Sequence, residues 1–157
     1  MAHEDLVKGV ARFVVLGQPS SERPVHAGMG IVINKQLIAT CAHVLNAALR
    51  APSDSVNKPD QVFPVLFPFA DGVKAYPSVV LNDGWFPEED IAVVRLLNEE
   101  IPPEVGIASL AHKGHSIIIG EKLSAWGVAE NETEGHNVSG LYSGPVGRGR
   151  RQIDGPG

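Results

Sequence analysis

The chain has 157 residues, of which 43% are hydrophobic, so it can bury a core in one domain or in two small lobes. Its formal net charge of -5 gives no electrostatic reason to expect nucleic acid or an anionic membrane as a partner. The 17 glycines and 12 prolines favour many turns and short strands over long helices, which predicts an all-β fold.

The sequence of the first half of the chain predicts strands separated by turns, with one short helix. Apolar runs rich in β-branched residues predict strands at 7–16, 28–33, 37–40, 62–69 and 75–81. The second and third of these form a hairpin, in which Gly28 and Gly30 should allow a bend or a close approach of another backbone. Helix-favouring residues at 42–49 predict a short helix directly after the hairpin. Prolines in the last two runs should confine those strands to sheet edges or strand ends.

The second half continues the strand pattern after an interruption. A pair of prolines breaks the apolar pattern, and we place a linker near residues 98–105. We therefore expect a first unit at 1–100 and a second unit at 101–157. The candidate strands of the second unit are residues 116–119, 122–128 and 137–142. The basic run at 148–151 is interpreted as a solvated loop.

The cysteine content and the N-terminal residues indicate which cellular compartment to expect. No run approaches the ~20 consecutive apolar residues that span a bilayer. The first residues lack the basic-then-apolar pattern of a secretory signal. The single cysteine, Cys41, rules out an internal disulfide framework and agrees with a reducing environment. We therefore expect a cytoplasmic protein with no membrane partner.

Two short stretches each place one titratable side chain at the edge of an apolar strand. His43 follows the uncharged residues 37–42, and a histidine in that setting can act as a general base at neutral pH. Asp90 opens the apolar run 91–94, where a carboxylate is costly to bury unless an imidazole or a similar group donates to it. Each has a plainer interpretation, since His43 could be a core residue bonded to a backbone carbonyl and Asp90 part of the acidic turn 88–90. Together they predict two members of a charge-assisted catalytic triad that lie within hydrogen-bond reach of one another.

These stretches, with the strand before them, resemble a known family. Residues 28–33 (Gly-Met-Gly-Ile-Val-Ile), 40–43 (Thr-Cys-Ala-His) and 90–93 (Asp-Ile-Ala-Val) are similar, in order and spacing, to its Gly-Ser-Gly, Thr-Ala-Ala-His and Asp-Ile-Ala segments. Over about residues 8–157 the chain resembles the trypsin-like serine peptidases of the bacterial, disulfide-free type. The resemblance implies a chymotrypsin-like double β-barrel with a complete first barrel and an incomplete second barrel. It also implies a polypeptide substrate and no cofactor.

The resemblance assigns roles to single residues. It implies that His43 is the general acid and base and that Asp90 orients it, while a peptide bond is cleaved through an acyl-enzyme. Gly157 resembles the first glycine of the family's Gly-x-Ser-Gly-x-Pro motif. The nucleophilic serine is then expected two positions after it, and Gly157 supplies one N–H of the oxyanion hole. Residues 153–156 would border the specificity pocket, so Asp154 favours a basic side chain before the cut.

Other interpretations stay open, because a fragment without that serine should be nearly inactive. The chain could be a non-catalytic pseudo-peptidase that holds an extended peptide by strand addition. It could also be one half of a split peptidase, whose second barrel is completed by a C-terminal remainder or a partner chain. Ser143 lies in a Gly-Leu-Tyr-Ser-Gly-Pro segment that imitates a nucleophile motif. The residues after it are too few and too rich in Gly and Arg for closing strands, so we expect a turn there.

Two further chemistries are not expected. His112 and His115 form a His-x-x-His pair, but neither a carboxylate nor a thiol lies at ligand spacing, so we predict no metal site. Cys41 stands two residues before His43, and we expect its side chain to point to the opposite face as a small buried hydrophobic group. Trp85 and Trp126 are expected in the core or in a cleft wall.

Overall fold

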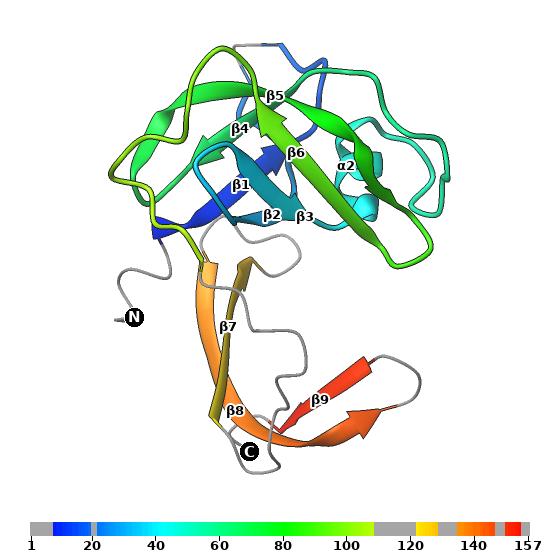
Figure 1. Ribbon diagram of the computed structural model, residues 1–157, viewed down its shortest axis with the longest axis vertical. Coiled ribbons are helices and arrows are strands. Elements are labelled where there is room, and N and C mark those ends of the chain that lie inside the picture. The colour runs from blue at the N-terminus through cyan, green and yellow to red at the C-terminus, as the bar shows by residue number, and fades with distance from the viewer. Residues whose placement is uncertain (1–7, 20–21, 109–121, 129–134, 147–149, 155–157) are drawn as a thin grey trace. The chain divides into compact units, whose positions relative to one another are not determined.

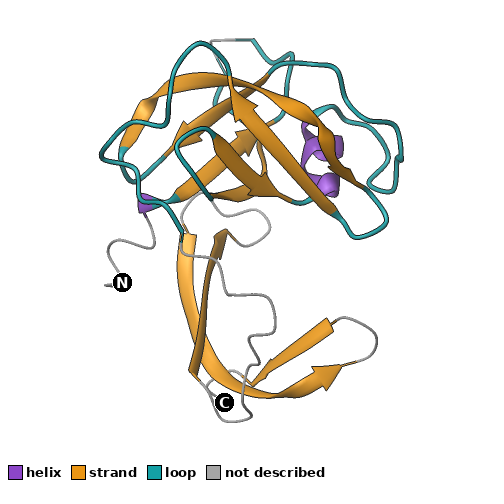
Figure 2. Cartoon of the chain, in the orientation of Figure 1, coloured by secondary structure: helices purple, strands orange, loops and turns teal. Residues whose placement is uncertain are grey.

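The computed structural model describes residues 8–19, 22–108, 122–128, 135–146 and 150–154. The chain divides into two compact units, Met1–Ser109 and Leu110–Gly157. Strands dominate both units, as the composition predicts (Figure 2). No helix within the described ranges is long and apolar enough to cross a membrane.

The first unit is a closed barrel of six antiparallel strands (Figure 1). Its strands are β1 (Val10–Val14), β2 (His26–Val32), β3 (Leu37–Thr40), β4 (Phe63–Phe67), β5 (Asp71–Phe86) and β6 (Ile91–Leu96). Their order around the barrel is β1-β2-β3-β6-β5-β4, and β4 pairs with β1 to close it. Helix α2 (Ala42–Ala48) follows β3 and contacts β1, β2 and β6. The predicted hairpin and the predicted helix are therefore confirmed.

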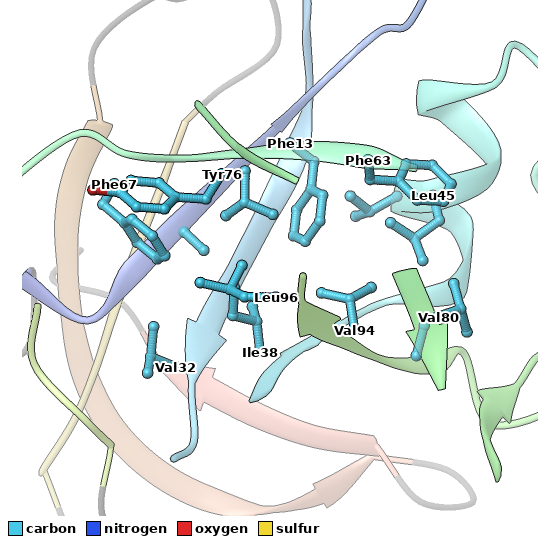
Figure 3. Close-up of a cluster of buried hydrophobic side chains, with 14 of the residues drawn as sticks. Phe13, Val32, Ile38, Leu45, Phe63, Phe67, Tyr76, Val80, Val94 and Leu96 are labelled. Carbon is cyan, nitrogen blue, oxygen red and sulfur yellow. The ribbon is translucent and has the colours of Figure 1, made fainter. Parts of the chain in front are cut away.

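Apolar side chains that alternate along the strands fill the barrel. In β4 and β6 every second residue is buried, which is the pattern of strands that turn one face toward a core. Phe13, Phe63 and Leu45 lie together in the interior, and all three are fully buried (Figure 3). Each such side chain stabilises the fold by about 1.5–3 kcal/mol as it leaves water. Because Leu45 belongs to α2, its burial fixes the helix against the barrel.

The expectation of sheet edges or strand ends holds for Pro64, the second residue of β4, but is wrong for Pro77, which lies inside β5. In the closed barrel β4 lies between β1 and β5, and β5 lies between β4 and β6, so neither is an edge strand. Pro64 and Pro77 stand opposite each other in the β4–β5 register. An antiparallel ladder alternates pairs that exchange hydrogen bonds with pairs that do not, and opposed prolines, which lack an N–H, are compatible with the second kind. The barrel can therefore hold both prolines at one position of the ladder.

Residues 98–105, which we expected to form a linker, pack against the first unit. Ile101 and Val105 belong to its buried core. The Ile101 N–H donates to the Lys35 carbonyl at 2.7 Å, and the Ala108 N–H donates to the Val32 carbonyl at 2.8 Å. These bonds tie the chain after β6 to the β2–β3 hairpin.

The described part of the second unit is an antiparallel sheet of three strands in the order β7-β8-β9. The strands are β7 (Lys122–Val128), β8 (Gly135–Val146) and β9 (Arg150–Asp154). β7 has the predicted bounds, whereas the candidate strand 116–119 lies outside the described residues. Arg150 and Arg151 begin β9, so these two residues of the basic run are not in the loop that we expected.

Ser143 lies inside β8 and not in the turn that we expected. The β8–β9 register pairs Tyr142 with Ile153 and Gly144 with Gln152, so Ser143 is an extra residue on its strand. Such an insertion is a β-bulge, and bulges attract the glycines that also mark turns. The Gly-Pro sequence therefore indicated an irregularity of the strand and not its end.

Two glycines allow close packing around β2, as the sequence predicts. A Cβ built on Gly30 would lie 2.7 Å from the Ala39 carbonyl oxygen on the neighbouring strand. A Cβ built on Gly28 would lie 2.4 and 2.7 Å from the two methyl carbons of Val44 in α2. Val44 is buried and β-branched, so its side chain has little freedom to move away. Gly28 thus sets how closely α2 approaches β2.

Gly28→Ala should lower the free energy of unfolding by about 1–3 kcal/mol, the usual cost of overpacking a core. Val44→Ala removes the two methyl groups that the new Cβ would meet. In the Val44→Ala background the same Gly28→Ala change should therefore cost much less. Urea denaturation of the four proteins in this double-mutant cycle measures the coupling, and additive effects would contradict the packing described here.

Candidate active site

The first turn of α2 takes its cap from a distant part of the sequence. Cys41 occupies the N-cap position with φ -91° and ψ 147°, and its side chain makes no capping hydrogen bond. The first N–H groups of a helix have no acceptor within the helix and need one from elsewhere. Here Oδ1 of Asp90, 47 residues away from His43, accepts the backbone N–H of His43 at 2.8 Å.

The other carboxylate oxygen of Asp90 contacts the ring of the same histidine. Nδ1 of His43 and Oδ2 of Asp90 are 2.5 Å apart, which confirms the predicted hydrogen-bond reach. One carboxylate therefore holds both the main chain and the side chain of His43. Because the carboxylate engages Nδ1, Nε2 is the ring nitrogen that can meet a reacting group. The His43 side chain is 51% exposed, so the ring is accessible from solvent.

Asp90 is the last residue of the turn that joins β5 to β6. Phe86 and Ile91 pair across this turn, and the Asp90 N–H donates to the Pro87 carbonyl at 3.3 Å. The backbone of Asp90 has φ 56°, a left-handed conformation that Asn and Asp adopt more readily than most residues. Residues 88–90 are thus an acidic turn, as the plainer interpretation held, and the last of them reaches His43. The Asp90 side chain is 48% exposed, not buried as we expected, because it precedes the strand.

The surroundings of Asp90 keep its carboxylate ionised. Burial is the largest single influence and would raise the pKa of this group. The hydrogen bonds from the backbone and ring of His43, the charge of His43 and the backbone N–H of Ala42 act in the opposite direction. Together they hold the pKa of Asp90 below its ordinary value of 3.8. A carboxylate that is charged at neutral pH can stabilise an imidazolium beside it.

A buried amide fixes the remainder of α2. Asn46 is 2% exposed, and its Nδ2 donates to the carbonyls of Ser53 and Ser55, both at 3.1 Å. The indole N–H of Trp85 donates to the Val56 carbonyl at 2.8 Å, which fastens the same loop to β5. Asn46 was not predicted from the sequence, where its only signal was a polar residue within an apolar helical run. These bonds give His43 a helix that cannot shift independently of the barrel.

Cys41 lies beside His43 and Asp90, contrary to expectation. Its Sγ and the ligand atoms of His43 and Asp90 all lie within 4.8 Å of one another. The expectation of opposite faces rested on strand geometry and was wrong, because Cys41 is the N-cap residue of α2 and His43 lies in the first turn of that helix. Cys41 does pack against the core, as predicted for a small hydrophobic group. Burial, and then the charge of Asp90, raise the pKa of its thiol, which makes it a poor nucleophile at neutral pH.

The other candidate residues belong to the second unit, lie outside the described residues, or pack in the barrel. Asp154 ends β9, where its Cα pairs with that of Leu141 in β8. Ser143 is exposed in the bulge of β8. Gly157 lies outside the described residues, as do both histidines of the His-x-x-His pair. In the first unit, Trp85 packs against the core, as predicted.

Comparisons with known proteins agree with this architecture. Residues 28–155 match the sequence model of a family described as trypsin-like peptidase domain. The MamO protease domain from Magnetospirillum magneticum superposes with a TM-score of 0.57 at 16% identity, over 97% of this chain and 71% of that one. A serine endoprotease from Yersinia pestis gives a TM-score of 0.57 at 18% identity, over 92% of this chain and 43% of that one.

Kallikrein-related peptidase 10 in complex with Zn²⁺ gives a TM-score of 0.56 at 15% identity, over 92% of this chain and 61% of that one. The chain thus spans less than two thirds of the length of kallikrein-related peptidase 10 and of the Yersinia pestis endoprotease. No curated protein sequence matches. At these identities the likeness concerns the fold, which is the predicted chymotrypsin-like one. The first barrel is closed, and the described part of the second is an open three-stranded sheet.

The lowered pKa of Asp90 can be measured directly by ¹³C NMR titration of the side-chain carboxyl groups. We expect the Asp90 resonance to titrate below pH 3.8, because the groups around it favour the ionised form. His43→Ala removes the ring but keeps the backbone N–H, so it should move the midpoint upward. A midpoint that does not change in His43→Ala would contradict the described ion pair. Asp60, whose carboxylate is almost fully exposed, serves as the internal control.

Proposed function

The chain belongs to the family of trypsin-like peptidase domains, and from this premise we propose that it supplies the histidine and the aspartate of a Ser-His-Asp triad. The reaction is hydrolysis of a peptide bond within a polypeptide. The observation that carries the proposal is the contact of His43 Nδ1 with Asp90 Oδ2 at 2.5 Å. The two residues stand on the segments that the family's pattern assigns to the base and its orienter.

The proposed mechanism uses both nitrogens of His43. Nε2 takes the proton of a serine hydroxyl while the serine oxygen attacks the carbonyl carbon of the substrate. The carboxylate of Asp90 stabilises the imidazolium and stays ionised throughout. The imidazolium then gives its proton to the leaving amine as the C–N bond breaks, which leaves an acyl-enzyme. A water molecule, deprotonated by Nε2 in the same way, attacks the acyl carbon. The C–O bond to the serine then breaks, the imidazolium returns its proton to the serine oxygen, and the acid is released.

The nucleophile in this proposal is a serine two positions after Gly157, as the family's motif places it. Gly157 would then give one N–H to the oxyanion hole, where charge develops on the carbonyl oxygen. Ser143 is the weaker candidate, because it lies in a bulge of β8 between two residues that pair with β9. A nucleophilic serine needs a tight turn that presents its hydroxyl. A C-terminal remainder or a partner chain would supply the serine and the further strands.

The first experiment is to sequence the encoding locus past codon 157 and to express the polypeptide that it encodes. A fluorophosphonate probe should label this protein at the serine two positions after Gly157. His43→Ala should lower the labelling rate by about 10⁴-fold or more, the usual effect of losing a triad base.

His26→Gln is the matched histidine control for this experiment. His26 lies on β2, where its Nδ1 accepts the Arg12 Nε–H at 3.2 Å, and it has no part in the proposed mechanism. This variant should label at the wild-type rate. Labelling that survives His43→Ala would contradict the triad. A residue other than serine at the expected position would favour a non-catalytic domain that binds peptides.

Substrate preference is proposed to depend on Asp154. It ends β9 three residues before Gly157. In the family's pattern, residues just before this glycine border the specificity pocket, and a carboxylate there would attract a basic side chain. The expressed protein should cleave after Arg and Lys faster than after Leu in otherwise identical peptides. Asp154→Ser should reduce this preference at least about tenfold, because close charge pairs couple by about 1.5 kcal/mol or more. Equal rates of wild-type cleavage across the series would contradict a role for Asp154.

A further inference from the structure

The candidate active site contains one side-chain group, a thiol, that the proposed mechanism does not use. His43 and Asp90 have roles in peptide hydrolysis, whereas the thiol of Cys41 has none. Yet Cys41 Sγ, a ring nitrogen of His43 and a carboxylate oxygen of Asp90 all lie within 4.8 Å of one another. No other group of three such residues occurs in the part of the chain that the structure describes. Thiolate, imidazole and carboxylate are the three ligand types that Zn²⁺ takes in proteins.

The distances between the ligand atoms of this cluster lie within about 1 Å of those in a zinc site. Bond lengths of about 2.0–2.3 Å place the ligand atoms of tetrahedral Zn²⁺ about 3.3–3.7 Å from one another. The His43–Asp90 contact at 2.5 Å must therefore widen by about 1 Å, and the widest separation, at most 4.8 Å, must narrow by a similar amount. The side chains of His43 and Asp90 are about half exposed, so we expect these two to make the adjustment around Cys41, which is partly buried against the core.

The hydrogen bonds that Asp90 accepts leave one of its carboxylate oxygens available to bind a metal ion. Oδ1 is held by the backbone N–H of His43 at 2.8 Å, while Oδ2 is the oxygen that faces the ring. An ion bound at Oδ2 leaves the bond at Oδ1 intact, and outer bonds of this kind orient ligating carboxylates. The solvent-accessible side of the cluster leaves room for water as a fourth ligand.

We propose that Cys41, His43 and Asp90 bind Zn²⁺, and that the bound ion reversibly blocks the peptidase site. On binding, the thiol proton passes to solvent, and the sulfur, nitrogen and oxygen atoms each donate an electron pair to the metal. The ion takes the place of the hydrogen bond between His43 and Asp90, so the imidazole cannot act as a base. The binding rests on the geometry of the three side chains alone. The inhibition rests in addition on the proposed function.

Cobalt tests the binding without any need for activity. Co²⁺ added to the wild-type protein should give the intense near-ultraviolet absorption of a thiolate-to-metal charge transfer, and Zn²⁺ should displace it. Cys41→Ala should lack this band and should bind Zn²⁺ at least about 100-fold more weakly in calorimetric titration, since even outer-shell changes cost 10–100-fold. His26→Gln should behave as wild type. A cobalt spectrum without the charge-transfer band in the wild type would overturn the site.

Cys41→Ala also separates this inference from the proposed function. The variant leaves His43 and Asp90 in place, and alanine is the residue that the family's segment carries at this position. In the polypeptide expressed from the full locus, Zn²⁺ should suppress fluorophosphonate labelling of the wild type, EDTA should restore it, and Cys41→Ala should label equally with or without zinc. Wild-type labelling that zinc does not affect would overturn the inhibition and leave the proposed function standing. If neither protein labels in EDTA, the proposed function and the inhibition fail, and the cobalt spectrum alone decides the metal site.

Discussion

One carboxylate, that of Asp90, joins the two segments on which the site depends. It accepts the backbone N–H of His43 in the first turn of α2, and it holds the ring of the same residue. Loss of a capping group of this kind typically costs about 0.5–2 kcal/mol. The same contact that stabilises the helix therefore fixes the orientation of the proposed base. It also explains why Cys41, a poor N-cap residue, is tolerated at the start of α2.

The barrel gives this contact its rigidity. Leu45 is buried among the phenylalanines of the core, Val44 fits against the bare backbone of Gly28, and the amide of Asn46 is bonded to the loop that follows. These three residues lie on successive positions of one short helix, and they fix it on different sides. On the other segment, the β5–β6 pairing ends at the turn that carries Asp90. His43 and Asp90 meet because both segments are anchored in the same closed barrel.

Local sequence patterns predicted the hairpin, α2 and the His43–Asp90 contact, since each depends on residues within one element or on a known order of motifs. They failed where pairing between strands decides the outcome. Pro64 and Pro77 stand opposite each other inside the barrel, a pairing that follows from the register and not from either local segment. Ser143 lies in a strand because its neighbours pair on both sides of a bulge. The place of Ile101 in the core likewise depends on contacts with a hairpin about 65 residues earlier.

The thiol of Cys41 changes what the site can do without changing how it is built. Hydrolysis needs the hydrogen bond between His43 and Asp90, whereas a metal ion needs the same atoms as ligands, so the two states exclude each other. The choice between them then follows mass action and depends on the ratio of free zinc to its dissociation constant. Movements of about 1 Å in half-exposed side chains suffice for the exchange, as zinc ligand geometry requires. The barrel and α2 do not need to move, so zinc can bind and leave with changes in these side chains alone.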